Sequence, residues 1–572
     1  MLRSARREHT PFQGLAAQAR VKLTVKVTPV EGLSMISTAM TGWLRIRSNR
    51  DGTYWTVRSA LVMASAALLL GVVAAPRAQA QFSLLHSFSG ADGANPQSVL
   101  IMNPSTGNLY GTTTNGTTGT VYGTVFQLSS SGSLTSLESF STTDSSAGLT
   151  PFAGLVMDSS GDLYGTTAYG GAYGRGSVFE LTPNSAGGYN YQVVYSFGSG
   201  QDGATPSSSL IIDGSGNLYG TTVSGGNTPS ACSSTIPAGC GTVFMLSPSS
   251  SAPWLKSTLY AFSSTDGQNP TGSLILDSAG NLYGTTEYGG RSQAGTVFML
   301  TKSTSAPWVQ TQMYTFAGST DGANPYAGVI RDSSGNLYGT TVYGGSNASL
   351  GSVFEISPSS QVPGTWTKAT LWAFTGGADG ANPYGVLILD PAGNLDGTTT
   401  NSGVTSTGAS AAGTVFSLSP TSSAPTGYSL TTLHTFSGAD GANPYAGLFR
   451  DSLGNLYGTT LNGGSPASGP ASGTVFKIAV QSPQTIIQGL INSVNGMSGN
   501  PLNSGGVTSL VQHLQHAYRL VYQGNYSGAI IKLQAFISEV QGLETAGTLT
   551  VDQANALINP AQTAINLLTA ML

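Results

Sequence analysis

The chain has 572 residues, enough for two or more domains and a large buried core, and its apolar content of 39% is ordinary for a soluble protein. It contains 77 glycines and only 8% charged residues, which favours many short strands joined by tight turns and argues against a cytosolic helical enzyme. Beyond residue 80 there are 10 basic and 22 acidic residues, a net charge of −12. An acidic body without a basic stripe argues against nucleic acid as a partner.

Residues 1–80 are predicted to form a leader that ends in a signal peptide. Its apolar region, at about 59–75, is shorter than the roughly 20 apolar residues that a transmembrane helix needs. The small residues of Ala78-Gln79-Ala80 indicate cleavage after Ala80. We therefore expect an exported protein, secreted or at the cell surface in an extracellular or periplasmic location, with no transmembrane anchor in the mature chain.

Residues 82–480 contain seven copies of one sequence unit. Each unit has an apolar run, then Leu-Tyr-Gly-Thr-Thr, then Gly-Thr/Ser-Val-Phe, and then a segment that ends in Phe. The second element begins at Leu109, Leu163, Leu218, Leu282, Leu337, Leu395 and Leu456, and only the copy at Leu395 has Asp396 in place of Tyr. These elements are short, rich in Val, Ile, Tyr, Phe and Thr, and bounded by Gly, Asn, Asp and Pro, so each unit predicts four strands.

The order of these elements predicts that the repeats close into a ring. The region opens with a strand of the fourth type, here called a Phe-type strand, from Leu84 to Ser89. It ends with the strand Gly473 to Val480, which no Phe-type strand follows. Pairing the first strand with the last would remove the open edges of a linear array. We therefore predict an all-β seven-bladed β-propeller. The alternative is a β-solenoid, which explains neither the order of the elements nor the count of seven.

The repeat Gly-Asn-Leu-Tyr-Gly-Thr-Thr, followed by Gly-Gly and Gly-Thr-Val-Phe, resembles the GloVer tandem repeat of Gloeobacter and Verrucomicrobia. The resemblance covers roughly residues 82–480. It implies an exported protein of the choice-of-anchor type, with a C-terminal anchoring module. It implies no enzymatic activity.

Residues 481–572 change from strand-like to helix-like patterning. Apolar residues recur at helical spacing in three segments, and an earlier helix at about 485–494 would complete a small four-helix bundle. Gly524-Asn525 separates two of these helices, and Thr550-Val-Asp-Gln553 is a capping box that opens the last one. Residues from about Gly506 to Leu568 are similar to the FIMAH domain. This resemblance implies an accessory role in surface interaction.

Cys232 and Cys240 lie in one long loop of the third unit. In an exported chain two cysteines this close are expected to form a disulfide, and no His or further Cys stands near them to complete a metal site. His513 and His516 share one helical face but lack a further ligand, so we predict no metal site and no cofactor there. His86 and His434 occupy equivalent repeat positions, which favours a packing role.

The candidate binding face carries two sets of residues. An Asp recurs in the turn before each new unit, where it could cap the turn or attract Ca²⁺ or a cationic ligand: Asp92, Asp202, Asp266, Asp321, Asp379 and Asp440, with Asp144 offset. Three tyrosines that precede Gly-Gly could stack on sugar rings or pack against a neighbouring blade: Tyr169, Tyr288 and Tyr343. The loops beside them vary from 10 to 20 residues, and variable loops on a rigid scaffold are where binding is expected.

Three classes of function fit these features. We expect a non-enzymatic extracellular or cell-surface scaffold that binds carbohydrate or an extracellular protein through this face, because no catalytic constellation is visible. The first alternative is a propeller-based polysaccharide lyase or glycosidase, which would need placed carboxylates, or a His, Tyr or Arg cluster, that break the repeat symmetry. The second alternative is a structural envelope protein.

Overall fold

We describe the protein from a computed structural model, which covers residues 44–47, 54–57 and 81–572 except for short gaps. The gaps are 117–119, 199, 227–231, 233–237, 250–253, 303–307, 347–348, 360–361, 363, 402–411, 422–423, 425, 467–470, 480–482, 498–501 and 570. In the N-terminal unit, strands β1 (Leu44–Arg47) and β2 (Tyr54–Val57) form an antiparallel pair. The predicted signal peptide and its cleavage site lie outside the described residues.

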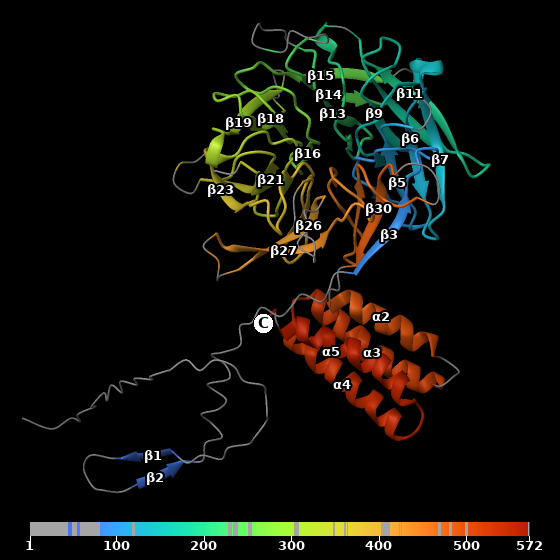
Figure 1. Ribbon diagram of the computed structural model, residues 1–572, viewed down its shortest axis with the longest axis vertical. Helices are drawn as coiled ribbons and strands as arrows, with labels where there is room; N and C mark the ends of the chain where they lie inside the picture. Colours follow the sequence, from blue (N-terminus) through green and yellow to red (C-terminus); the bar gives the residue numbers. More distant parts are fainter. Residues whose placement is uncertain are drawn as a thin grey trace, which may run out of the picture. The chain divides into compact units, whose positions relative to one another are not determined.

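Seven four-stranded antiparallel sheets form the blades of a β-propeller, arranged around a common centre (Figure 1). Blades 1 to 3 are β4 (Ile101–Met102), β5 (Leu109–Thr113), β6 (Val121–Leu128) and β7 (Leu134–Ser141); β8 (Val156–Met157), β9 (Leu163–Thr167), β10 (Ser177–Pro183) and β11 (Tyr189–Ser196); and β12 (Ile211–Ile212), β13 (Leu218–Thr222), β14 (Thr242–Ser247) and β15 (Leu255–Ala261). Blades 4 and 5 are β16 (Ile275–Leu276), β17 (Leu282–Thr286), β18 (Thr296–Thr301) and β19 (Val309–Thr315); and β20 (Ile330–Arg331), β21 (Leu337–Thr341), β22 (Ser352–Pro358) and β23 (Trp366–Ala373). Blades 6 and 7 are β24 (Ile388–Leu389), β25 (Leu395–Thr399), β26 (Thr414–Pro420) and β27 (Tyr428–Thr435); and β28 (Phe449–Arg450), β29 (Leu456–Thr460), β30 (Thr474–Ala479) and β3 (Gln81–Ser87).

The first strand of the propeller completes its last blade, which confirms the predicted ring closure. Strand β3 pairs antiparallel with β30, from Gln81 opposite Ala479 to Ser87 opposite Thr474, and the two lie side by side in blue and orange in Figure 1. Beyond the strand, Phe88 N donates to Gly473 O at 2.9 Å. Closure gives the last blade its fourth strand, so all seven blades have four strands, and this explains why the strand order is shifted by one element relative to the repeats.

Phenylalanine and glycine of the repeat pack every blade against the next. The Phe that follows each fourth strand contacts the Gly-Thr/Ser-Val-Phe phenylalanine of the next blade, with ring centroids 5.0–5.4 Å apart in all seven interfaces, including Phe88 against Phe126. This second ring lies over the glycine of Leu-Tyr/Asp-Gly-Thr-Thr, where a Cβ would come within 2.4–2.7 Å of it. The motif therefore needs glycine for close packing.

Threonine hydroxyls join the second and third strands of each blade. The last Thr of Leu-Tyr/Asp-Gly-Thr-Thr hydrogen-bonds the Thr or Ser that opens Gly-Thr/Ser-Val-Phe, with oxygen atoms 2.7–2.9 Å apart in all seven blades. These groups are buried, so each hydroxyl satisfies the other where water is excluded. The polar residues of the repeat are thus part of the core.

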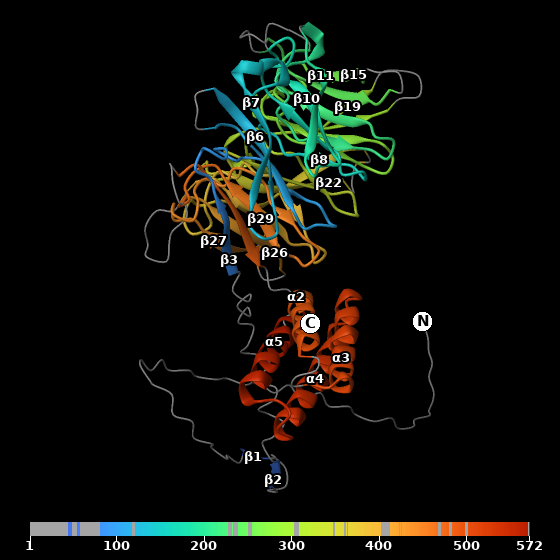
Figure 2. The same ribbon diagram turned by 90° about the vertical axis from the view of Figure 1, so that its right-hand side faces the viewer.

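Four helices follow the propeller: α2 (Pro483–Gly496), α3 (Ser504–Tyr522), α4 (Tyr526–Thr545) and α5 (Val551–Thr569) (Figure 2). They bury one apolar cluster that includes Leu510, Leu533 and Leu557. Asn525 caps α4 by accepting from Gly528 N, and Thr550 and Gln553 form the predicted reciprocal capping box of α5. None of the helices in the described part of the chain is long and apolar enough to span a membrane.

Cys232 and Cys240 form the predicted disulfide, with Cα atoms 5.2 Å apart. Both cysteines are buried, although part of the loop between them lies outside the described residues. They belong to an apolar cluster that also contains Phe262 of blade 3 and Leu274 of blade 4. The disulfide therefore fixes the base of the longest loop to the blade core.

Candidate functional site

One face of the propeller, here called the loop face, contains the turn before the first strand of each blade and the segment that follows Leu-Tyr/Asp-Gly-Thr-Thr. In every blade one residue of the turn forms a backbone bridge with one residue of the segment. The bridges are Ala94 with Asn115, Leu149 with Tyr169, Ala204 with Ser224, Gln268 with Tyr288, Ala323 with Tyr343, Ala381 with Asn401 and Ala442 with Asn462. The recurring Asp turns and the three predicted tyrosines therefore share this face.

The six recurring aspartates cap their own turns, and each carboxylate also contacts an aromatic side chain two residues before the Phe of its blade. The pairs are Asp92 with His86, Asp202 with Tyr195, Asp266 with Tyr260, Asp321 with Tyr314, Asp379 with Trp372 and Asp440 with His434, at 2.7–3.2 Å. Backbone N–H groups of the turn also donate to the carboxylate, as Ser89 N does to Asp92. This arrangement is that of turn caps, with each carboxylate directed to its own turn.

His86 and His434 pack as predicted and also form these hydrogen bonds, which the sequence analysis missed. The ring of His434 stacks on Phe82 of β3, the strand that closes the ring, with centroids 3.9 Å apart. The position two residues before the Phe holds His, Tyr or Trp in six units. All three side chains can donate a hydrogen bond, and this shared property could have predicted the contact with the aspartate. Only blade 1 departs, because Glu138 occupies this position near Asp144. Burial raises the pKa of Glu138, a backbone hydrogen bond opposes this, and the charge of Asp144 raises the pKa further.

A tyrosine cluster, defined as Tyr288, Tyr326, Tyr343, Tyr384 and Tyr445, lies on the loop face of blades 4 to 7. The rings of Tyr384 and Tyr445 stack with centroids 4.4 Å apart, and both meet the ring of Tyr326 edge-on at 5.3 and 5.6 Å. Tyr288 lies near Tyr343 and Tyr326, and Tyr343 forms a hydrogen bond with Tyr384. These outer two are 42% and 46% exposed, so aromatic surface remains available to a ligand.

The structure brings only two of the three predicted tyrosines together. Tyr288 and Tyr343 join the tyrosine cluster, whereas Tyr169 stands apart in blade 2, although it is 49% exposed and occupies the equivalent repeat position. The central tyrosines were missed because they follow the Pro of the turn, a position that holds Gln, Phe, Ser or Thr in blades 1 to 4. Their clustering depends on the closed ring, which brings side chains from three separate repeats into contact.

Glu287 is the carboxyl group of the tyrosine cluster. The position after Thr-Thr holds an uncharged residue in the other six units, so Glu287 breaks the repeat symmetry. Burial raises the pKa of Glu287, and a hydrogen bond from Tyr288 opposes the shift. Burial and the proximity of Glu287 raise the pKa of Tyr288 to about 12. The cluster therefore presents neutral hydroxyl groups and a carboxyl group that is easier to protonate than usual.

A chain of asparagine amides runs through blades 6, 7 and 1, where Asn115, Asn401 and Asn462 hold the repeat position that Tyr288 and Tyr343 hold in blades 4 and 5. Side-chain hydrogen bonds of 3.1–3.4 Å link consecutive members. The members in order are Asn115, Asn95, Asn462, Asn443, Asn401 and Asn382. The loop face thus has an aromatic sector and an amide sector, a division that the repeat itself does not contain.

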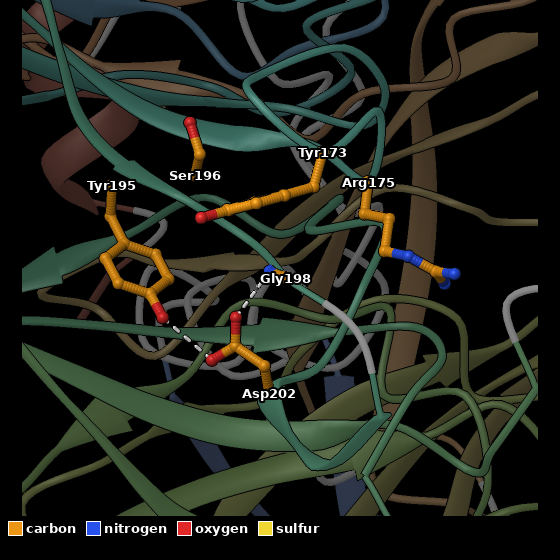
Figure 3. Close-up of a pocket in the computed structure, with 6 residues that line it drawn as sticks. All are labelled: Tyr173, Arg175, Tyr195, Ser196, Gly198 and Asp202. Carbon is orange, nitrogen blue, oxygen red and sulfur yellow. Dashed lines mark hydrogen bonds between the residues drawn. The ribbon is translucent and has the colours of Figure 1, made fainter.

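A second feature of the loop face is a pocket of about 640 Å³ in blade 2, here called the rim pocket (Figure 3). Its lining residues are Tyr173, Arg175, Tyr195, Ser196, Gly198 and Asp202. Figure 3 shows Tyr173 extending toward Ser196 and Tyr195, whereas Arg175 starts beside Tyr173 and extends away from them. Among these residues only Asp202 was a predicted site residue, and it lies at the base of the turn as a cap.

The helical histidines form no convergent ligand set in the described part of the helices. His513 Nε2 lies 3.3 Å from Glu539 Oε2, which joins α3 to α4. Both side chains are about one-third exposed, so this is a partly solvated ion pair between helices when the histidine is protonated.

Known proteins resemble the chain through its repeats. The sequence pattern of the Gloeobacter/Verrucomicrobia repeat matches three times, over residues 70–231, 226–426 and 311–531. A comparison with curated proteins gave no match.

Solved structures resemble the chain only remotely. A protein of unknown function from Dyadobacter fermentans is 10% identical, covering 71% of this chain and 100% of that one, with a TM-score of 0.37. A glucose dehydrogenase is 15% identical, covering 70% and 100%, with a TM-score of 0.36. An ulvan lyase of a polysaccharide lyase family is 11% identical, covering 53% and 78%, with a TM-score of 0.32. These scores are too low to support an inference about activity.

The repeat matches together extend from residue 70 to residue 531, which is well over half of the chain. They agree with the resemblance that the Leu-Tyr-Gly-Thr-Thr units show. The chain belongs to the Gloeobacter/Verrucomicrobia repeat family.

Proposed function

We propose that this protein is an exported, non-enzymatic scaffold that binds carbohydrate through the tyrosine cluster of its loop face. The observation that carries the proposal is the break in repeat symmetry at this cluster. Seven equivalent units would give seven equivalent surfaces, yet tyrosines gather only in blades 4 to 7. The cluster therefore has a purpose beyond holding blades together, because blades 1 to 3 close without it.

The chemistry of the tyrosine cluster suits a neutral sugar. The C–H faces of a sugar ring are apolar and can stack on the exposed rings of Tyr288 and Tyr343, as ligands generally do on aromatic-lined sites. Hydroxyl groups of the same sugar can exchange hydrogen bonds with the tyrosine hydroxyls, with Glu287 and with the asparagine amides. A carboxyl group with a raised pKa disfavours the negative charge that would select a cation.

Export is part of the same proposal. The signal-peptide features of residues 59–80 support it, as does the disulfide, which persists in oxidising compartments. Cleavage after Ala80 would leave Gln81, the first residue of β3, as the new N-terminus and keep the closing strand intact. The choice-of-anchor type and the FIMAH-like accessory role of the helices belong to this proposal as well.

Screening of the purified protein against an array of neutral and acidic glycans tests the proposal. We expect binding of a defined glycan class by the wild type, and loss of the neutral hits in the Tyr288→Ala/Tyr343→Ala double variant. Tyr169→Ala is the matched control, because Tyr169 has the same repeat position and exposure outside the cluster. Absence of any neutral hit contradicts the proposal and favours a structural envelope protein.

A degrading enzyme is the second candidate, and the raised pKa of Glu287 is the observation that favours it. Such an enzyme would shorten the bound glycan, which chromatography of each array hit after prolonged incubation detects. We expect intact glycan with both the wild type and Glu287→Gln. Shortened products with the wild type but not with Glu287→Gln would show that the protein is an enzyme and contradict the non-enzymatic scaffold.

A further inference from the structure

We propose that the rim pocket binds the anionic group of an acidic sugar. In this inference Arg175 recognises the charge, and Tyr173 provides the surface on which a sugar ring stacks. The proposal shares with the proposed function the premise that the loop face binds carbohydrate. It concerns a different blade and a different ligand charge, so the two can fail separately.

The carboxylate of the rim pocket is already occupied. Asp202 accepts hydrogen bonds from Tyr195 Oη at 2.8 Å and from Gly198 N at 2.5 Å, and its Oδ1 lies 2.8 Å from Lys256 Nζ. Burial raises the pKa of Asp202, but Lys256 and the other donors lower it more, so its value lies below the ordinary one. Asp202 and the buried Lys256 therefore form a neutral pair that neither attracts nor repels an anion strongly.

Arg175 is left as the uncompensated charge of the rim pocket. Its guanidinium has no carboxylate within 4.0 Å among the described residues, whereas Lys256, Lys368 and Arg450 are all paired. Arg175 is also half-buried, unlike the exposed Arg291 and Lys302. A half-buried cation without a counter-ion, in a propeller with many more acidic than basic residues, indicates a site for an external anion.

The repeat supports a specific role for this arginine. The residue before Gly-Thr/Ser-Val-Phe is uncharged in the other six units: Tyr122, Cys240, Ala294, Leu350, Ala412 and Ser472. The backbone at Arg175 performs the usual structural task, since its carbonyl accepts from Thr205 N at 2.9 Å. This structural task is performed by the backbone and does not involve the guanidinium.

Tyr173 and Arg175 together define the class of ligand. Tyr173 is 67% exposed, which leaves a ring face free for stacking. A guanidinium binds carboxylate or sulfate through paired N–H donors. Because the two side chains extend in different directions in Figure 3, an acidic oligosaccharide is better suited than a single sugar to contact both.

Calorimetric titration of the purified protein tests the inference with three probes of equal length. The probes are a tetramer of galacturonate, a sulfated galactan tetramer and the neutral galactan tetramer. We expect at least one acidic probe to bind about tenfold or more tightly than the neutral one, and the preferred anion identifies the source of the charge. Arg175→Gln should remove this preference, and Tyr173→Ala should weaken the acidic probes.

Arg291→Gln is the matched control, because Arg291 is an exposed arginine in the equivalent loop of blade 4. It should leave the preference for acidic probes unchanged. Equal binding of acidic and neutral probes, no binding of either acidic probe, or an equal loss in Arg175→Gln and Arg291→Gln would each overturn the anion site. The proposed function fails on a different result, namely neutral binding that survives Tyr288→Ala/Tyr343→Ala.

Discussion

Arg450 of blade 7 forms a buried ion pair with Asp396 of blade 6, with Nη2 and Oδ2 2.7 Å apart. Asp396 is only 1% exposed and is the residue that replaces Tyr in the sixth Leu-Tyr-Gly-Thr-Thr unit. Arg450 Nη1 also lies 3.4 Å from Asp390, the turn aspartate of blade 6. In blades 3, 4, 5 and 7 the equivalent aspartate accepts a hydrogen bond from the hydroxyl of the Tyr that Asp396 replaces in blade 6. The replacement of Tyr by Asp396 is thus compensated by a residue of the next blade.

Removal of either partner of this pair should destabilise the propeller. Arg450→Ala leaves a buried carboxylate without its counter-charge, so we expect the free energy of unfolding to fall by about 3–5 kcal/mol. The double variant Asp396→Tyr/Arg450→Leu restores the pair found between blades 5 and 6, where Tyr338 and Leu389 share one apolar cluster, and should recover most of the loss. Denaturant unfolding measures both. Wild-type stability in Arg450→Ala would show that the pair is not the compensation described.

Deletion of residues 81–89 should destabilise the whole propeller. The closing strand pairs with β30, and Phe82 and Phe88 pack on rings of blades 6 and 1, so three blades lose contacts together. We expect a clear decrease in the melting temperature of the main calorimetric transition. A main transition at the wild-type temperature, with only a small local change, would contradict a ring that depends on this strand.

The disulfide should stabilise the third blade modestly. It closes a loop with a sequence separation of 8 residues, for which loop-closure entropy gives about 2–3 kcal/mol. Cys232→Ser/Cys240→Ser should lower the free energy of unfolding by up to this amount, and reductant should have the same effect on the wild type. Labelling of unreduced, denatured protein should find no free thiol. Two labelled cysteines would exclude the bond.

Acid should destabilise the propeller through its turn aspartates. Burial raises the pKa of Asp92 and Asp440, but hydrogen bonds from histidine and the turn lower them more, so both lie below the ordinary value of 3.8. A carboxyl group whose pKa is lower in the folded state adds stability above its unfolded-state pKa and loses it as the pH falls through the folded-state pKa. The free energy of unfolding should therefore fall from about pH 5 to below pH 3.

The variant Asp92→Asn/Asp440→Asn tests whether these turns are the cause. It should be less stable than the wild type at pH 6 and should lose less stability on acidification. Unfolding curves at a series of pH values measure the difference. If the free energy of unfolding depended on pH in the same way in both proteins, the turn aspartates would not be the cause of the acid destabilisation.

The sequence predicted the blades well because each repeat carries its own strand pattern, and the shift in strand order predicted the closure. The sequence did not predict the partners that the ring brings together. Asp396 looked like an isolated departure until the structure placed Arg450 beside it from the next unit. Tyr326, Tyr384 and Tyr445 were missed for the same reason, since they meet only when three repeats converge. The turn aspartates were visible, but their partners on the fourth strand were not.

The most direct test of the central claim is calorimetric titration of the wild type and Tyr288→Ala/Tyr343→Ala with the neutral glycan that binds most tightly in the array. We predict at least a tenfold loss of affinity in the double variant, because two stacking surfaces are removed, and an unchanged affinity in Tyr169→Ala. All three proteins should have the same melting temperature within a few degrees, since both substituted side chains are nearly half exposed. Equal affinities for the wild type and the double variant would contradict the account.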